Sequence, residues 1–191
     1  ARRLARRVVG SMPGNAPVVV NAAGCGAAMK EYDFLLRDDP DYAEKAKRFT
    51  ALVKDAGEFV AGLGLVGPLQ PINLTVTYQD PCHLAHGQKI RRQPRELLQA
   101  IPGLKLVEMD GSDRCCGSAG IYNLTHASMS QQLLKEKMQA VGAANADAVV
   151  APNPGCMLQL RYGGQNYGPN LPVYHLMDLL DRAYGEAPGK P

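Results

Sequence analysis

Apolar residues follow two alternating patterns along the chain, short unbroken runs and longer stretches with helical spacing. The short runs predict buried strands at residues 17–20, 73–78, 104–109 and 148–151. The longer stretches predict helices at residues 27–37, 41–63, 94–100, 127–144, 157–162 and 176–184. Because strands separated by helices pair in parallel and are covered by those helices, the pattern predicts an α/β fold with a parallel sheet flanked by helices.

Two segments of the chain repeat the same local design. Residues 17–25 and residues 148–156 each contain an apolar strand, a turn with Asn and a Gly-Cys pair that leads into a helix. If the whole second copy had a counterpart in the first, the partners of Cys82, Cys115 and Cys116 would precede residue 1. We therefore expect a tandem cysteine-rich repeat with the first copy truncated, within a longer polypeptide.

A segment rich in Gly and Pro, residues 62–71, separates the two copies. We expect residues 1–69 to be the carboxyl-terminal part of the first copy, residues 70–185 the complete second copy, and residues 186–191 a tail. The arginines among the first seven residues are expected to form the solvated face of a helix.

Each of the five cysteines lies shortly after a predicted strand. Cys25, Cys82 and Cys156 directly follow predicted strands, and Cys115 and Cys116 follow another strand after a short loop. Because the carboxyl ends of parallel strands share one edge of a sheet, we expect all five cysteines to gather there. Their odd number and the lack of a secretory signal argue against a disulfide framework and predict a cytoplasmic protein.

Charge, hydropathy and motif content argue against nucleic-acid binding, a transmembrane segment and two common enzyme classes. The net charge of +3 and the isoelectric point near 8.6 are too mild to predict nucleic-acid binding. Glutamate, glycines and prolines interrupt the least charged stretch, near residues 56–73, so the sequence predicts no transmembrane segment. The sequence also lacks the glycine loops of nucleotide-binding proteins and the nucleophilic serine motif of hydrolases.

Clustered thiolates are typical ligands of iron–sulfur clusters and of zinc. Gly117 and Gly120, just after the adjacent pair of cysteines, let the backbone approach a bound group and leave amides free to point at sulfur. His83 adjoins Cys82. We expect these two glycines and His83 to surround the ligands of a metal site without binding the metal themselves.

Four strings of sequence carry a resemblance to a known family. They are Asn21-Ala-Ala-Gly-Cys-Gly26, Asp80-Pro-Cys-His-Leu-Ala-His-Gly87, Cys115-Cys-Gly-Ser-Ala-Gly-Ile-Tyr-Asn123 and Asn153-Pro-Gly-Cys156. In this order they resemble the carboxyl-terminal cysteine-rich (CCG) region of the glycolate oxidase iron-sulfur subunit family, which is related to the cysteine-rich subunit of heterodisulfide reductase. The resemblance extends over about residues 18–184.

The resemblance implies an electron-transfer iron–sulfur module, a non-catalytic subunit of a glycolate or other 2-hydroxy acid oxidase complex. It implies that a flavoprotein subunit delivers the electrons, which then pass toward the respiratory chain. The implied cluster ligands are Cys82, Cys115, Cys116 and Cys156, with Cys25 as a possible metal ligand of the truncated copy. Any contact with the inner membrane is implied to be peripheral and made through partners.

The chain departs from the family pattern at one point in each copy. The full motif ends in Cys-x-x-Cys, but Gln159 follows Cys156 and Ala28 follows Cys25 at that spacing. Four cysteines remain in the second copy, which is enough for a 4Fe-4S cluster or for a tetrahedral zinc ion. A zinc-binding docking domain and a thiol redox domain that uses the adjacent pair of cysteines are the alternative hypotheses.

Overall fold

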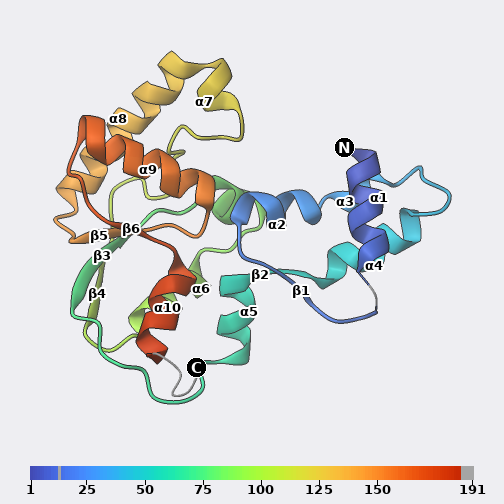
Figure 1. Ribbon diagram of the computed structural model, residues 1–191, viewed down its shortest axis with the longest axis horizontal. Coiled ribbons are helices and arrows are strands. Elements are labelled where there is room, and N and C mark those ends of the chain that lie inside the picture. The colour runs from blue at the N-terminus through green and yellow to red at the C-terminus, as the bar shows by residue number, and fades with distance from the viewer. Residues whose placement is uncertain (13, 186–191) are drawn as a thin grey trace, which may run out of the picture.

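A computed structural model describes residues 1–12 and 14–185 of the chain. In chain order, the elements are α1 (Arg2–Ser11), β1 (Val18–Val20), α2 (Ala23–Met29), α3 (Tyr32–Leu35), α4 (Ala43–Leu52), β2 (Val53–Asp55), α5 (Ala56–Leu63), β3 (Leu74–Tyr78), the π-helix η1 (His83–Gly87), α6 (Arg92–Gln99), β4 (Leu104–Val107), α7 (Tyr122–Thr125), α8 (Ala127–Ala143), β5 (Ala148–Val150), α9 (Pro154–Tyr167), β6 (Val173–Tyr174) and α10 (Leu176–Tyr184). Figure 1 shows a larger body built around the sheet of β3 to β6 and a smaller lobe built from α1, α3 and α4.

The main sheet has four strands in the order β4-β3-β5-β6. Leu74 of β3 lies opposite Leu104 of β4, Val76 of β3 lies opposite Ala148 of β5, and Val149 of β5 lies opposite Val173 of β6. Every one of these pairings is parallel, so the carboxyl ends of the four strands lie at the same edge. The predicted α/β class, with parallel strands flanked by helices, is confirmed.

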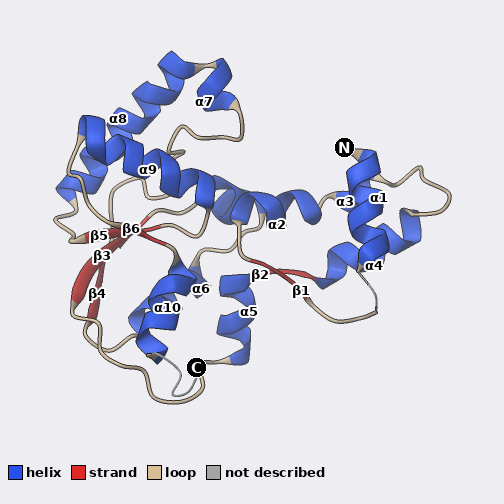
Figure 2. Ribbon diagram, in the orientation of Figure 1, coloured by secondary structure: helices blue, strands red, loops and turns tan. Residues whose placement is uncertain are grey.

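Strand β5 shows how both faces of the sheet are covered. Ala148 and Val150 belong to the apolar cluster that includes residues of α6 and α10, whereas Val149 belongs to the cluster that includes residues of α8 and α9. Successive residues of a strand point to opposite faces, so a strand with helices on both sides is apolar at every position. Figure 2 shows these helices on the two sides of the strands.

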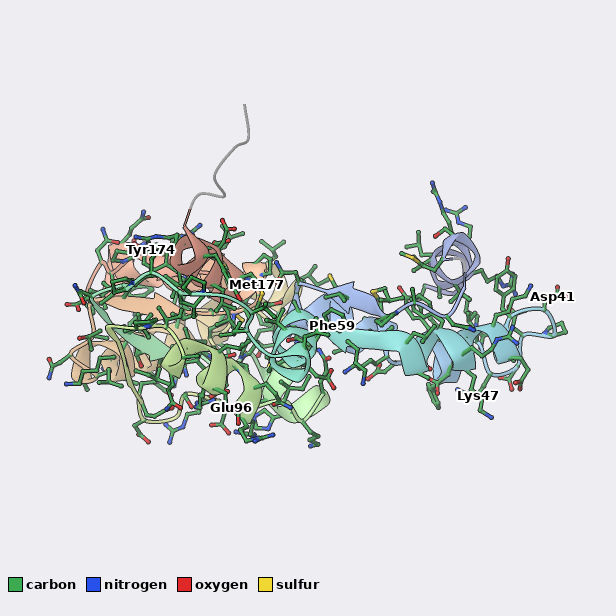
Figure 3. All side chains as sticks on the ribbon, turned by 90° about the horizontal axis from the view of Figure 1, so that it is seen from below. Asp41, Lys47, Phe59, Glu96, Tyr174 and Met177 are labelled. Carbon is green, nitrogen blue, oxygen red and sulfur yellow. The ribbon has the colours of Figure 1, made fainter. Side chains whose placement is uncertain are left out.

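The smaller lobe has its own sheet and its own core. Strands β1 and β2 pair in parallel, with Val18 opposite Val53, and Phe49 of α4 is buried in the cluster beside them. The arginines of α1 are exposed, as predicted, and Arg6 forms an ion pair with Asp39. Figure 3 shows the resulting elongated shape, with Asp41 and Lys47 at one end and Tyr174 near the other.

The single helix predicted over residues 41–63 is wrong. The structure divides this stretch into α4, the strand β2 and α5. Val53 and Asp55 are buried while Lys54 between them is exposed, which is the alternation of a strand. Asp55 then starts α5, because its carboxylate accepts hydrogen bonds from Gly57 N and Glu58 N at the amino end of that helix.

Four further details differ from the sequence-based expectation. The helix predicted over residues 27–37 is two short helices, α2 and α3, and the helix expected from residue 157 begins at Pro154. Proline is well suited to the first turn of a helix, because an N–H at that position would have no partner within the helix. Strand β6 and the π-helix η1 were not predicted, since neither has a periodic pattern long enough to detect.

None of the helices in residues 1–12 and 14–185 is long and apolar enough to cross a bilayer. The division into copies at residues 69 and 70 stays a prediction. Val60 and Ala61 of α5, which precede that boundary, pack against the core under α6 and α10. The tail expected at residues 186–191 lies outside the described residues.

Candidate metal centre

One cavity of about 370 Å³ is lined by all five cysteines. Cys82 follows β3, Cys115 and Cys116 lie in the loop after β4, and Cys156 lies in the first turn of α9 after β5. Cys25 reaches the cavity from α2, which follows β1 of the smaller sheet. Cys82, Cys115, Cys116 and Cys156 therefore gather beyond the carboxyl ends of the main sheet, as expected. The expectation that all five cysteines share one sheet edge is wrong for Cys25, because β1 pairs with β2 in a separate sheet.

The loop with the adjacent cysteines is held by α8 and α9. Gly117 has a φ of 90°, and its N–H donates to Cys115 Sγ at 3.3 Å. Ser130 Oγ of α8 donates to the Gly117 carbonyl at 2.8 Å, and Gln159 Nε2 of α9 donates to Ser130 Oγ at 3.1 Å. Gln159, at the position where the family motif has its last cysteine, thus supports the loop through Ser130.

Asn153 connects Cys156 to α2. Its Nδ2 donates to Cys156 Sγ at 3.3 Å, and its Oδ1 accepts a hydrogen bond from Gly24 N at 3.1 Å. Cys25 is the next residue after Gly24 and is exposed. The same side chain therefore orients one buried sulfur and fixes the backbone beside Cys25.

Three residues were expected to surround the metal ligands. Gly117 contacts sulfur through its amide, as described above. His83 is exposed, and its Nδ1 lies 3.6 Å from Cys82 Sγ. Gly120 lines the cavity and has open space beside its Cα. The roles of these three residues stay predictions.

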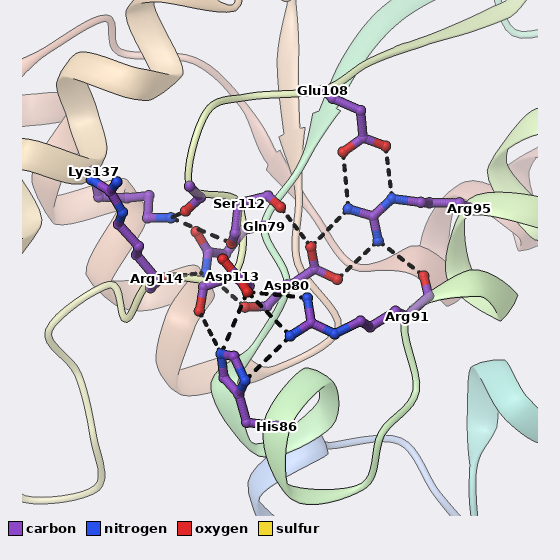
Figure 4. A network of polar contacts seen from close by, with 11 residues as sticks. Gln79, Asp80, His86, Arg91, Arg95, Glu108, Ser112, Asp113, Arg114 and Lys137 are labelled. Atoms are coloured by element: carbon purple, nitrogen blue, oxygen red, sulfur yellow. Dashed lines mark hydrogen bonds and ion pairs between the residues drawn. The ribbon is translucent and has the colours of Figure 1, made fainter.

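Asp80 and Arg95 form the centre of a polar network that the sequence did not predict (Figure 4). The guanidinium donates to both carboxylate oxygens of Asp80, at 2.9 and 2.7 Å, and to both oxygens of Glu108, at 2.7 and 2.9 Å. Ser112 Oγ also donates to Asp80 at 2.8 Å. Asp80 lies two residues before Cys82, and Ser112 lies in the loop that leads to Cys115, so this network fixes two cysteine loops relative to each other.

Replacing Asp80 with asparagine is expected to lower the free energy of unfolding of the metal-free chain by about 2 kcal/mol. The amide keeps the shape of the buried carboxylate but removes its charge and one acceptor. Arg95 keeps its hydrogen bonds to Glu108. Urea unfolding measures the difference. The matched control is Asp113→Asn, which removes a more exposed carboxylate paired with Arg91 and should cost less. Equal losses in the two variants would contradict the central role of Asp80.

The thiols of Cys82, Cys115, Cys116 and Cys156 influence one another's pKa. A hydrogen bond to Cys115, together with burial, raises the pKa of Cys82 above its usual range, while hydrogen bonds from Cys116 and Cys82 lower the pKa of Cys115. Hydrogen bonds to Cys115 and Cys156 raise the pKa of Cys116, and the bond from Cys116 lowers that of Cys156. The pKa values of these four thiols are therefore linked in the order 82, 115, 116 and 156.

The chemistry of these donors fits an iron–sulfur cluster. Four soft sulfur ligands face one cavity, where Cys116 and Cys156 are buried and Cys82 and Cys115 are half-buried. A Cβ at Gly117 would overlap the carbonyl oxygen of Ser130, so the loop takes this close path only with glycine there. In the part of the chain that the structure describes, no three His, Cys, Asp or Glu side chains converge as ligands of a single metal ion.

Several residues that shape this site were not assigned a role from the sequence. Arg95 and Ser112 act through contacts with distant residues, so no local pattern marks them. Asn153 stands in the Asn-Pro-Gly-Cys string, but its hydrogen bonds to Gly24 and Cys156 depend on the fold. Lys137 had a detectable signal. It lies on the face of α8 where the spacing of Leu134, Met138 and Val141 predicts burial, and a charged residue on such a face is unusual.

Comparison with known proteins agrees with this geometry. Residues 76–161, which include the four cysteines in series, match the family model of the cysteine-rich domain CCG. The chain contains a CCG cysteine-rich domain. The CCG domain begins within β3 and ends within α9, so it takes in each of the three loops that supply these cysteines.

Curated relatives extend the likeness beyond the CCG domain. The chain is 42% identical to the probable glycolate oxidase iron-sulfur subunit of Bacillus subtilis, over 88% of this chain and 39% of the relative. It is 31% identical to the glycolate oxidase iron-sulfur subunit of Escherichia coli, over 87% and 39% of the two chains. It is 33% identical to a subunit of the fumarate reductase (CoM/CoB) of Methanothermobacter marburgensis, over 92% and 34%. The chain thus spans about two fifths of these relatives or less.

A solved structure shares the fold. The crystal structure of a hypothetical protein from Helicobacter pylori matches with a TM-score of 0.54 and 15% identity, over 82% of this chain and 32% of that one. At this identity the match bears on the fold alone. The names of the curated relatives and the CCG domain support an iron–sulfur electron-transfer module.

Proposed function

We propose that Cys82, Cys115, Cys116 and Cys156 hold an iron–sulfur cluster of the 4Fe-4S type, through which this chain transfers electrons. The observation that carries the proposal is that these four cysteines, from three separate loops, line one cavity. A cluster bound there would supply one-electron chemistry. The chain itself would have no catalytic residue for the substrate.

The residues around the cavity would control solvent access to the cluster and donate hydrogen bonds to its sulfur ligands. Cys116 and Cys156 are buried, so water has little access to the cavity from their side. Cys82 is half-buried and Cys25 is exposed, so the cavity opens toward solvent on the side of these two residues. Electrons would enter or leave there. The backbone N–H of Gly117 and the side-chain amide of Asn153 donate to sulfur, and hydrogen bonds of this kind stabilise the charge on a ligand and tune its potential.

The names of the relatives suggest the surroundings of this module. By analogy with the glycolate oxidase iron-sulfur subunits, the partner is a flavoprotein subunit that oxidises glycolate or another 2-hydroxy acid and passes electrons on toward the respiratory chain. The complex would be cytoplasmic, with any contact with the membrane made through partners. Residues 1–69 would be the end of a first cysteine-rich copy, in which Cys25 is a possible ligand.

Metal analysis of the full chain, prepared and reconstituted without oxygen, tests the proposal. We expect iron and acid-labile sulfide, a brown colour that dithionite bleaches, and an electron paramagnetic resonance signal in the reduced protein. One equivalent of zinc without iron would overturn the proposal in favour of a structural docking domain. Metal-free protein in which one thiol is alkylated selectively at mildly acidic pH would overturn it in favour of a thiol redox domain.

A further inference from the structure

Lys137 is a buried cation without a carboxylate partner. The residue is 3% exposed, and of the described residues that are buried it is the one lysine or arginine. Its Nζ donates to the carbonyl oxygens of Gly111 at 2.6 Å and Ser112 at 3.3 Å. None of the ion pairs among the described residues contains Lys137. Burying an ammonium group is costly unless a negative charge compensates it.

The thiols of the candidate site are among the groups that interact with this ammonium. The two carbonyls that it contacts belong to the loop that leads to Cys115, and Lys137 and Cys115 line a common cavity of about 490 Å³. Asp110 and Glu136 also line this cavity, and neither is buried.

The buried and half-buried carboxylates nearby already have partners of their own. Asp80 is paired with Arg95, and Asp113 is paired with Arg91 at 3.1 Å (Figure 4). The charge of Lys137 therefore forms no ion pair with them, although Asp113 and Asp80 interact with it at a distance, as do Cys116 and Cys115. A cluster bound by thiolates is anionic, and each electron that it accepts adds one more negative charge. A fixed cation beside it favours the reduced form.

We propose that Lys137 is a built-in counter-charge for the cluster held by Cys115 and its neighbours, and that it raises the reduction potential of this cluster. The inference rests on the proposed function, because it requires a redox-active cluster in the cavity. Lys137 is then a positioning and tuning residue: it holds the loop before Cys115 through two carbonyls, and it sets how readily the cluster accepts an electron.

The test is a redox titration of the reconstituted full chain, followed by electron paramagnetic resonance, with Lys137→Gln, Lys137→Arg and Lys135→Gln. The glutamine keeps a donor for the loop carbonyls but removes the charge. We expect it to shift the ratio of oxidised to reduced cluster at a fixed potential about tenfold toward the oxidised form, which is about 59 mV for one electron. Lys137→Arg keeps the charge and should stay within about twofold of the wild type. Lys135→Gln, on the same helix, is the matched control and should cause no shift.

Each outcome decides the matter. A Lys137→Gln protein with the wild-type potential and full iron content would overturn the inference and leave the proposed function intact. If Lys137→Gln takes up no iron, the arginine variant decides: a loaded cluster of wild-type potential supports the counter-charge, and an iron-free arginine variant shows that Lys137 only braces the loop. Wild-type protein without iron would instead refute the proposed function itself.

Discussion

Replacing Cys116 with serine is expected to lower the iron content of the reconstituted chain by about tenfold or more. Cys116 is 2% exposed and lines the same cavity as Cys115 and Cys156. A serine hydroxyl has nearly the same size, so the buried loop should keep its path. It is, however, a harder and far less acidic ligand than a thiol. Iron and sulfide analysis with the visible absorption spectrum measures the loss.

The matched control for this variant is Cys25→Ser. Cys25 lines the same cavity but comes from α2 and is exposed, so its serine variant is expected to retain most of the iron. If Cys116→Ser keeps a wild-type cluster, Cys116 is not a ligand, and the proposed set of four is wrong. If Cys25→Ser loses the cluster as completely as Cys116→Ser does, the site needs a ligand from the first copy.

The gathering of the cysteines could be predicted because it depends on local signals alone. The apolar runs before Cys25, Cys82 and Cys156 are short and bounded by Gly or Pro, which marks them as strands. Parallel pairing of β3, β4 and β5 then places whatever follows these strands at one edge, without any knowledge of side-chain contacts. Cys25 follows β1 of the separate sheet, so this rule does not explain its place beside the others. Which of these cysteines bind a metal stays a prediction, because the thiol contacts do not identify an occupant.

Features that depend on distant partners could not be predicted. Residues 53–55 have the spacing of the helical stretch around them, and they form a strand because β1, more than thirty residues earlier, pairs with them. In the sequence Arg95 cannot be distinguished from an ordinary exposed helical arginine, because its ion pairs with Asp80 and Glu108 form only in the fold. The position of the Lys137 ammonium near Cys115 could not be predicted either, because the fold brings the loop before Cys115 against α8.

Replacing Gly117 with alanine is expected to lower the free energy of unfolding of the metal-free chain by about 3 kcal/mol. Gly117 has a φ of 90°, where an L-residue is strained by about 1 kcal/mol. The new Cβ would also overlap the backbone oxygen of Ser130, with the Ser130 Oγ at 3.1 Å, and a helix backbone cannot move aside cheaply. The hydrogen bond from Ser130 Oγ to the Gly117 carbonyl is therefore expected to break as well. Denaturant unfolding under reducing conditions measures the change.

Gly120→Ala separates the two causes of this loss. Gly120 has a φ of 65° in the same loop, but a Cβ there would meet no atom within 4 Å. Its substitution should therefore cost only the backbone strain, about 1 kcal/mol. Equal losses for the two alanine variants would mean that strain alone accounts for the effect and that α8 does not constrain the path of the loop. A loss at Gly117 about two to three times larger, accompanied by weaker iron binding, would mean that the contact with Ser130 positions Cys115 and Cys116 for the cluster.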